Sequence, residues 1–398
     1  MIRLQLLPFS VVVTGLTLLL VTISRCGGDE NDPVTDASSG QAGCQLVDSG
    51  FGPDGTLSVH TEPVVTGLVT PWEIAFLPAS SDWLVTERPG RLRLVRNGAL
   101  VGTAVTTVQT VDSGEGGLLG LALDPQFEKN SQFYLYFTAT PSSGNVNRVQ
   151  RFLLSTDHLS AQAQDVILDN LPWYSVHDGG RIKFGPDGML YVSTGEGNDP
   201  SLPRDTNSPS GKILRISKDG SIPSDNPEPG KPWFIKGLRN PQGFDWIGSN
   251  HLLVADNGPT GEYQGRTGGD KIAVLKRGED LGWPTIWHCE SAPGLVSPIL
   301  TWVGAVPPGG ALVYQGNDIP EWKGNVLVAS TGGEQLQRIV LGSDGMSTAS
   351  HEVYFQGDLG RLRTVVQGPA GEIYITTSNC DSRGTCPAEQ DGIYRVTK

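Results

Sequence analysis

The sequence predicts an all-β fold, a six-bladed β-propeller made of four-stranded antiparallel blades. Short stretches of alternating apolar and polar residues follow one another from about residue 57, and no long segment has the 3.6-residue period of a helix. The chain has 52 Gly and 28 Pro among its 398 residues, which is typical of many tight turns between strands. A third observation, a phrase that recurs six times, sets the number of blades.

The repeated phrase is an apolar strand, a turn, a second strand of the type LYVS or LLVA, a variable loop and a final strand of the type ILRI. Its copies begin at Pro71, Gly117, Gly179, Asn240, Gly309 and Arg363. Units of three or four antiparallel strands cannot bury both faces alone, and they are the sequence signature of blades stacked around a channel. Six copies therefore predict six blades.

A strand left over before the first repeat is expected to close the ring. The segment TLSVHTEPVVTGL begins at Thr56, and the last repeat is one strand short. Pairing the two removes exposed strand edges that would favour aggregation. The propeller is thus expected to form one catalytic domain over residues 45–398.

The N-terminus is expected to be an export signal. An apolar run from Leu4 to Ile23 follows Arg3, so residues 1–25 have the layout of a signal peptide and residues 26–44 that of a flexible polar linker. The run is also long enough to be an uncleaved membrane anchor. The residues before Cys26 resemble a bacterial lipoprotein processing site. We expect an exported protein, periplasmic or attached to the envelope through a lipidated Cys26.

The cysteines agree with export. If Cys26 is lipidated or removed, four of the five cysteines remain, and an oxidising compartment allows them to pair. Cys380 and Cys386 are close enough in sequence for a local disulfide, which leaves Cys44 to pair with Cys289. No His/Cys pair has the spacing of a zinc site.

The charge of the chain does not favour a nucleic-acid partner. Its 29 Lys and Arg against 42 Asp and Glu give a net charge of −13, whereas phosphate binding needs a basic surface.

Polar residues in the loops between blade strands are the candidates for chemistry, because such loops gather at one end of a propeller channel. His177 precedes a Gly-Gly turn and is a possible base, although a lone histidine is more often structural. Basic residues also flank the strands that open blades, namely Arg239 with the adjacent Asn240, and Arg361 and Arg363. They are either ordinary surface charges or a group of cations at the end of the channel that binds a polyanionic ligand. The Gly-rich loop from Ala255 could offer calcium carbonyl and carboxylate oxygens.

Several phrases together resemble the soluble quinoprotein glucose dehydrogenase and aldose sugar dehydrogenase family, also called the glucose/sorbosone dehydrogenase family. They occur in family order over about residues 57–398: GEGGLLGLALDPQF, HDGGRIKFGPDGMLYVSTGEGND, GLRNPQGF, NGPTG, GGDKI followed by LGWP, and GRLRTVVQGPAGEIYITT. The resemblance implies a six-bladed propeller that binds pyrroloquinoline quinone (PQQ) and calcium. It also implies oxidation of aldose sugars at the anomeric carbon to lactones, with electrons passed to an unidentified acceptor.

The resemblance also implies roles for individual residues. His177 looks like the base that takes the proton of the anomeric hydroxyl, and Arg239 like the group that polarises the quinone carbonyl. The residues similar to other cofactor contacts are Glu115, Asn240, Arg361 and Arg363. The residues similar to the calcium site are Gly258 and Pro259, through their carbonyl oxygens, and the nearby Asp270.

The chain differs from the best-studied branch of the family at two places. That branch has a cofactor-binding Lys where this chain has Thr331, Gly332 and Gly333, and an Asp where it has Val176. The expected substrates are therefore aldoses broadly rather than glucose alone. Two alternatives stay open: a binding propeller without catalysis, and a calcium-dependent lactonase-type hydrolase.

Overall fold

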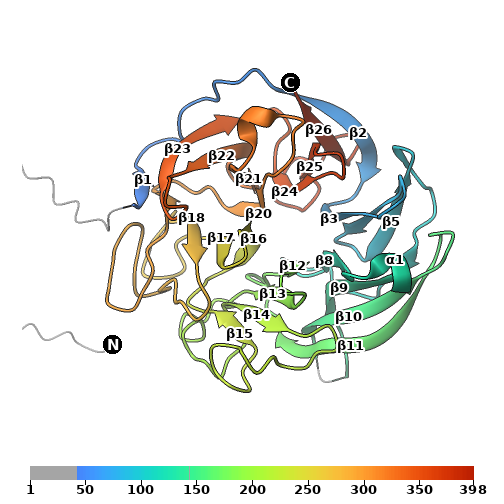
Figure 1. Ribbon diagram of the computed structural model, residues 1–398, viewed down its shortest axis with the longest axis horizontal. Helices are drawn as coiled ribbons and strands as arrows, with labels where there is room; N and C mark the ends of the chain where they lie inside the picture. Colours follow the sequence, from blue (N-terminus) through green and yellow to red (C-terminus); the bar gives the residue numbers. More distant parts are fainter. Residues whose placement is uncertain (1–42, 143) are drawn as a thin grey trace, which may run out of the picture. The chain divides into compact units, whose positions relative to one another are not determined.

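Nearly all of the regular secondary structure in the described chain consists of short antiparallel strands arranged in a ring (Figure 1). The computed structural model describes residues 43–398 except residue 143, and these belong to one compact unit, residues 39–398. The expected signal peptide, Cys26 and nearly all of the expected linker lie outside the described residues. No helix in the described range is long and apolar enough to cross a membrane.

The first three blades follow the chain in order. Blade 1 contains β3 (Pro71–Phe76), β4 (Trp83–Glu87), β5 (Arg91–Arg96), β6 (Ala99–Leu100) and β7 (Thr106–Thr107). Blade 2 contains β8 (Leu118–Leu123), β9 (Gln132–Ala139), β10 (Val146–Leu154) and β11 (Ala161–Pro172), with the short helix α1 (Phe127–Asn130) between its first two strands. Blade 3 contains β12 (Ile182–Phe184), β13 (Leu190–Thr194), β14 (Lys212–Ile216) and β15 (Trp233–Ile235).

The other three blades complete the circle. Blade 4 contains β16 (Pro241–Ile247), β17 (His251–Asp256), β18 (Lys271–Leu275), β19 (Leu300–Trp302) and β1 (Gln45–Val47). Blade 5 contains β20 (Pro308–Val313), β21 (Val326–Ser330), β22 (Gln335–Leu341) and β23 (Thr348–Tyr354), with the 3₁₀ turn η1 (Pro320–Trp322). Blade 6 contains β24 (Leu362–Gln367), β25 (Ile373–Thr377), β26 (Asp391–Thr397) and β2 (His60–Leu68).

The predicted ring closure is confirmed. Strand β2 pairs antiparallel with β26, from His60 opposite Thr397 to Leu68 opposite Asp391, and so supplies the strand that the last repeat lacks. Two blades have more than the four antiparallel strands predicted. Strand β1 adds to blade 4 by parallel pairing with β19, and the two-residue strands β6 and β7 share the outer edge of β5.

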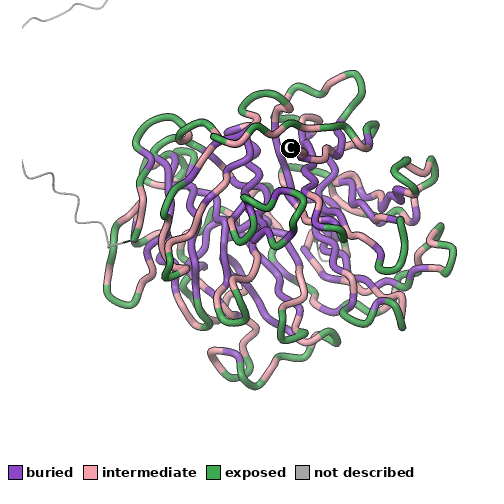
Figure 2. The backbone as a smooth tube through the Cα atoms, turned by 45° about the horizontal axis from the view of Figure 1, so that its top comes forward, coloured by how far each residue is buried: buried purple, intermediate pink, exposed green. Residues whose placement is uncertain are grey.

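The hydrophobic core lies between neighbouring blades, as the repeat pattern requires. Leu92 of blade 1 packs with Phe133 of blade 2, and one such cluster fills each junction around the ring. The last junction joins Ile393 of blade 6 to Val85 of blade 1. Figure 2 shows the consequence: the strands are buried along most of their length, and exposure concentrates in the connecting loops.

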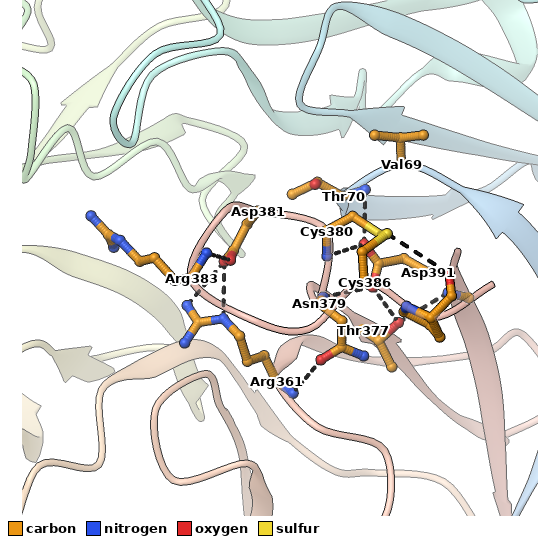
Figure 3. The surroundings of a disulfide bond; sticks show 12 residues. Val69, Thr70, Arg361, Thr377, Asn379, Cys380, Asp381, Arg383, Cys386 and Asp391 are labelled. Carbon is orange, nitrogen blue, oxygen red and sulfur yellow. Dashed lines mark hydrogen bonds and ion pairs between the residues drawn. A yellow bond between two sulfur atoms is a disulfide. The ribbon is translucent and has the colours of Figure 1, made fainter. Parts of the chain in front are cut away.

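Both predicted disulfides are present, Cys44 with Cys289 and Cys380 with Cys386. The first ties the segment before β1 to blade 4. The second closes a short loop in blade 6, and Asp391 fastens this loop to the start of blade 1 (Figure 3). The buried Asp391 carboxylate accepts hydrogen bonds from the main-chain N–H groups of Thr70, at 3.1 Å, and Cys380, at 3.1 Å.

Candidate active site

A cavity of about 380 Å³ collects the loops of all six blades. It contains every residue predicted for the site except Pro259 and Asp270. Its lining residues are Trp72, Arg88, Glu115, Val176, His177, Arg239, Asn240, Gln242, Asn257, Gly258, Thr260, Pro307, Thr331, Arg361, Arg363, Asp381 and Arg383.

His177 lies in the loop between β11 and β12 and is only 7% exposed. Its Nδ1 atom is 2.9 Å from Oε1 of Glu196, which is itself buried. Because a carboxylate accepts hydrogen bonds, Nδ1 carries the proton and Nε2 keeps its lone pair. The backbone φ of His177 is 62°, a left-handed conformation that is unfavourable for a side chain of this size. The histidine is therefore fixed in the tautomer and orientation of a base.

Glu115 joins the loops of three other blades. One carboxylate oxygen, Oε2, accepts the main-chain N–H of His177 at 2.9 Å and the side-chain amide of Asn240 at 3.0 Å. The other, Oε1, accepts a hydrogen bond from Arg383 at 2.9 Å. Burial raises the pKa of Glu115, but the charge of Arg383, the hydrogen bonds from Arg383 and the His177 N–H, and the charge of the His177 ring when it is protonated outweigh it, and the pKa lies below its usual value. Glu115 is thus ionised at neutral pH.

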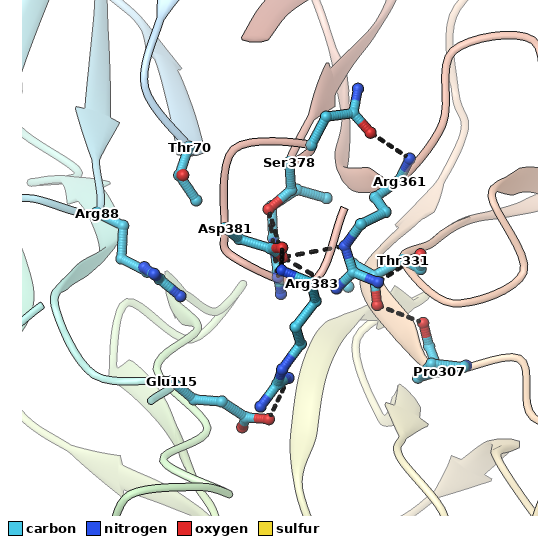
Figure 4. A network of polar contacts seen from close by, with 12 residues as sticks. Thr70, Arg88, Glu115, Pro307, Thr331, Arg361, Ser378, Asp381 and Arg383 are labelled. Carbon is cyan, nitrogen blue, oxygen red and sulfur yellow. Dashed lines mark hydrogen bonds and ion pairs between the residues drawn. The ribbon is translucent and has the colours of Figure 1, made fainter. Parts of the chain in front are cut away.

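Two arginines of blade 6 share one carboxylate. Arg361 donates through Nε and Nη2 to Oδ2 of Asp381, at 3.1 and 2.9 Å (Figure 4). Arg363 donates to the same oxygen at 3.5 Å. Arg361 also donates to the carbonyl oxygen of Thr331, at one of the positions where the best-studied branch has Lys. Burial lowers the pKa of Arg363 to about 10, although Asp381 opposes the change. The positive charges of Arg361 and Arg363 therefore share the single negative charge of Asp381.

Arg239 and Asn240 stand at the entry to β16. The Asp256 carboxylate accepts the main-chain N–H of both residues. Glu262 holds the guanidinium of Arg239 through its Nε, at 3.0 Å, and Nη2. The Asn240 side chain accepts the N–H of Gly179 at 3.0 Å and thereby supports the turn that follows His177.

The residues predicted for calcium take two different positions. Gly258 lines the cavity, whereas the buried Asp270 lies behind it and accepts the N–H groups of Gly258, at 2.7 Å, and Val306, at 2.6 Å. Burial raises the pKa of Asp270, and these two hydrogen bonds oppose the rise. Asp270 therefore shapes the Gly258 backbone. Within residues 43–398, leaving out 143, no three or more His, Cys, Asp or Glu side chains are grouped to hold a metal.

A buried ion pair lies under the cavity. Arg181 pairs with Glu73, donates to the carbonyl oxygens of Gln242 and Gly309, and stacks 4.1 Å above the ring of Trp72. Trp72 and Gln242 line the cavity, while Glu73 lines a second cavity of about 500 Å³. The Arg181 side chain thus lies between the two cavities and links the inner strands of several blades.

Several residues of the site were missed at the sequence level. Asp381 and Arg383 lie within the loop that the Cys380–Cys386 disulfide closes, so the predicted disulfide was a usable signal for them. Glu196 follows β13 in the phrase STGEGND, and no local spacing ties it to His177. Arg88, from the turn after β4, pairs with Asp112 at 2.8 Å and lines the opposite wall from Arg361.

The chain is similar to known sugar dehydrogenases along most of its length. The Glucose / Sorbosone dehydrogenase family model matches residues 68–385. Aldose sugar dehydrogenase YliI of Escherichia coli is 28% identical over 351 residues, which cover 80% of this chain and 90% of the relative. An uncharacterized protein of Synechocystis is 28% identical over 412 residues, covering 94% and 97%.

Solved structures give the same result. The PQQ-bound aldose sugar dehydrogenase of Streptomyces coelicolor superposes with a TM-score of 0.75 and 33% identity, covering 87% of this chain and 99% of that one. The fold and most of the length of the chain therefore match those of known sugar dehydrogenases. The chain belongs to the glucose/sorbosone dehydrogenase family.

Proposed function

We propose that the protein is a PQQ-dependent dehydrogenase that oxidises aldose sugars at C1 to lactones. The observation that carries the proposal is the placement of His177, oriented by Glu196, in one cavity with the arginines of blade 6. Family membership and the PQQ-bound relative support the same reaction class.

The cavity fits a flat, anionic cofactor. PQQ carries three carboxylates, and Arg361 and Arg363 share only Asp381 between them. Among the described residues, the buried Nε of Arg363 has no hydrogen-bond partner, and burial lowers the pKa of this side chain to about 10. A carboxylate placed here would stabilise the charged guanidinium. Arg361, Arg363, Asn240 and Arg239 are thus the residues that would hold PQQ.

The residues of this chain act on the proton of the sugar C1 hydroxyl. When bound, PQQ supplies a quinone that accepts hydride. The Nε2 atom of His177 takes the proton of the C1 hydroxyl as the C1 hydrogen leaves with its electron pair, and the C1–O bond becomes the carbonyl of the lactone. Glu196 stabilises the imidazolium that forms, since its carboxylate is already bonded to Nδ1. Arg239, fixed by Glu262, presents positive charge where negative charge develops.

Calcium is proposed at the backbone of Gly258 and Pro259. Calcium prefers hard oxygen ligands, and main-chain carbonyls supply them without added negative charge. Gly258 lines the cavity, and Asp270 fixes its backbone. The ion would add positive charge to the same cavity that the blade 6 arginines line.

We further propose export of the protein, with attachment to the envelope through a lipidated Cys26. The two disulfides support maturation in an oxidising compartment. The proposed partners are an aldose and an electron acceptor that the site does not identify.

The direct test is reduction of an artificial dye by the purified apo-protein with a panel of aldoses, with and without PQQ and calcium, alongside a PQQ-binding titration. Activity that needs both additions is the expected result. Binding of PQQ without turnover of any aldose would favour a binding propeller. Lactone hydrolysis without PQQ that EDTA abolishes would favour a hydrolase.

A further inference from the structure

The loop between Cys380 and Cys386 carries an arginine into the candidate active site. Arg383 lies in this loop, its side chain is 48% exposed, and its Nη1 donates to Glu115, 268 positions earlier in the chain. Figure 4 shows the Arg383 side chain extending from the blade 6 loop toward Glu115. The disulfide confines the residues that carry Arg383 to a short closed loop.

The loop is also anchored from inside. The N–H of Arg383 donates to Oδ1 of Asp381 at 3.0 Å, while Oδ2 of Asp381 accepts from Arg361 and Ser378. The N–H of Cys380 is held by Asp391. Arg383 therefore projects from a loop whose backbone is held at Cys380 and at Arg383 itself.

Glu115 connects Arg383 to the base. The carboxylate that accepts from Arg383 through Oε1 accepts the His177 main-chain N–H through Oε2. His177 has φ 62°, in the left-handed region that residues other than glycine adopt infrequently, and its neighbours hold it in this conformation. The bond from Glu115 acts on the same residue whose backbone is strained.

The charged groups around Glu115 make Arg383 the main compensating cation. His177, Asp178, Arg363 and Arg383 all interact electrostatically with Glu115. Burial raises the pKa of Glu115, and Arg383 contributes the largest opposing effect. Without Arg383, a buried carboxylate would lie beside the His177 backbone with less compensation.

We propose that the Cys380–Cys386 loop is a positioning device for the base: Arg383 holds Glu115, and Glu115 holds the backbone of His177. The loop thus couples a disulfide in blade 6 to a residue in blade 3. Arg383 is a positioning residue because it acts through Glu115. The kinetic part of the inference rests on the proposed function, whereas the structural part can be tested on the apo-protein.

The experiment uses two perturbations and two matched controls. Arg383→Gln removes the cation, and Cys380→Ser with Cys386→Ser opens the loop. Cys44→Ser with Cys289→Ser opens the other disulfide, which fastens β1 to blade 4. Arg395→Gln removes a partly exposed arginine of the same blade that pairs with Asp318, outside the cavity.

The first readout is the histidine ring-proton NMR spectrum of the apo-protein, in which His177→Asn identifies the signal of His177 among six histidines. We expect the His177 signal to shift in Arg383→Gln and in the Cys380/Cys386 variant, and to stay in place in both controls. An unshifted signal in Arg383→Gln would overturn the proposal, whether or not the disulfide variant folds. This readout does not depend on the enzyme reaction.

The second readout is the pH profile of kcat/KM for aldose oxidation. Arg383→Gln removes a positive charge and leaves the negative charge of Glu115 in place, so a proton binds more readily beside the base. We therefore expect the acid limb of the Arg383→Gln profile to move to higher pH by about one unit. The double variant Glu115→Gln/Arg383→Gln should move the limb back, because a neutral amide needs no cation. A limb that moves equally in Arg395→Gln, or that the double variant leaves displaced, would contradict the proposed coupling.

Discussion

His177 illustrates how a single residue of this site is determined from several directions. Its ring is bonded to Glu196 and its main-chain N–H to Glu115, while its φ lies in the left-handed region. An ordinary surface histidine needs none of these contacts. Their combination in one cavity is what distinguishes a base from the structural histidine that the sequence also allowed.

Glu196→Gln tests the orientation of the base. A glutamine keeps the size of the side chain but cannot stabilise an imidazolium by charge, so we expect kcat to fall by about 10²-fold or more with PQQ affinity little changed. Steady-state kinetics and a PQQ titration of the same preparation measure the two effects. Glu228 accepts a hydrogen bond from Trp233 in blade 3, and Glu228→Gln is the control. An equal loss of kcat in this control would show that the effect is not local.

Arg363→Gln tests the anion site. Loss of a charge-assisted pair with a cofactor carboxylate costs about 1.5–3 kcal/mol, so the Kd for PQQ should rise by about 10- to 100-fold. The measurement is a PQQ titration followed by fluorescence quenching. Arg148→Gln, which removes an arginine paired with Asp169 outside the cavity, should leave the Kd unchanged. An unchanged Kd in Arg363→Gln would remove Arg363 from the cofactor site.

At the scale of elements, the ring is closed both by β2 and by Asp391 at the start of β26. The Asp391 carboxylate accepts from the Thr70 N–H before β3, the Thr377 hydroxyl at the end of β25, and the N–H groups of Asn379 and Cys380. It therefore links the first blade, the last strand and the disulfide loop. The strand pairing follows from the sequence pattern, whereas this buried carboxylate is visible only in three dimensions.

Asp391→Ala should weaken this closure. Several buried N–H groups would lose their acceptor, and we expect the free energy of unfolding to fall by about 3 kcal/mol or more. Urea unfolding followed by tryptophan fluorescence measures it. Asp318→Ala, which removes a partly exposed carboxylate paired with Arg395, is the control and should cost less than about 1 kcal/mol. Similar losses in both variants would argue against a special role for Asp391.

At the scale of the whole molecule, buried ionisable groups make stability depend on pH. Asp178, next to His177, is 2% exposed; Asn147 and the Tyr174 N–H donate to its Oδ1, and among the described residues its Oδ2 has no partner. Burial raises the pKa of Asp178 to about 7. Between about pH 4 and 7 the folded protein holds a proton that the unfolded chain has released, so this group's contribution to stability decreases as the pH rises through that range.

Asp178→Asn should remove this dependence. We expect the free energy of unfolding of the variant relative to the parent to increase by about 2–3 kcal/mol from pH 5 to pH 8, because about two pH units of this range lie below the folded pKa and each contributes ~1.4 kcal/mol. Urea unfolding at both values measures the difference. His351, whose pKa burial lowers, also titrates, but it is present in both proteins and cancels in the comparison. A constant difference across this range would mean that Asp178 is ionised throughout.

The sequence by itself determined the architecture of this protein. Six copies of one strand phrase fixed six blades, because each unit has apolar faces that only neighbouring blades can cover, and the spare strand before Pro71 fixed the closure. The parity of the cysteines gave both disulfides. Phrases that resemble the family and occur in its order predicted residues from His177 to Arg363, and these line one cavity because their loops end at the same side of the ring.

The tertiary structure alone decided which charges meet. Glu196 lies 19 positions from His177, Arg383 lies 268 from Glu115, and Asp381 serves two arginines from another loop. The pair of Arg383 and Glu115 depends on the closed ring, which brings loops of two different blades together. The other two contacts form within blade 3 and within blade 6, where the ends of neighbouring strands meet without any regular spacing along the chain. The structure also shows what the sequence did not, that the Asp270 carboxylate accepts the N–H groups of Gly258 and Val306 and so supports the Gly258 backbone.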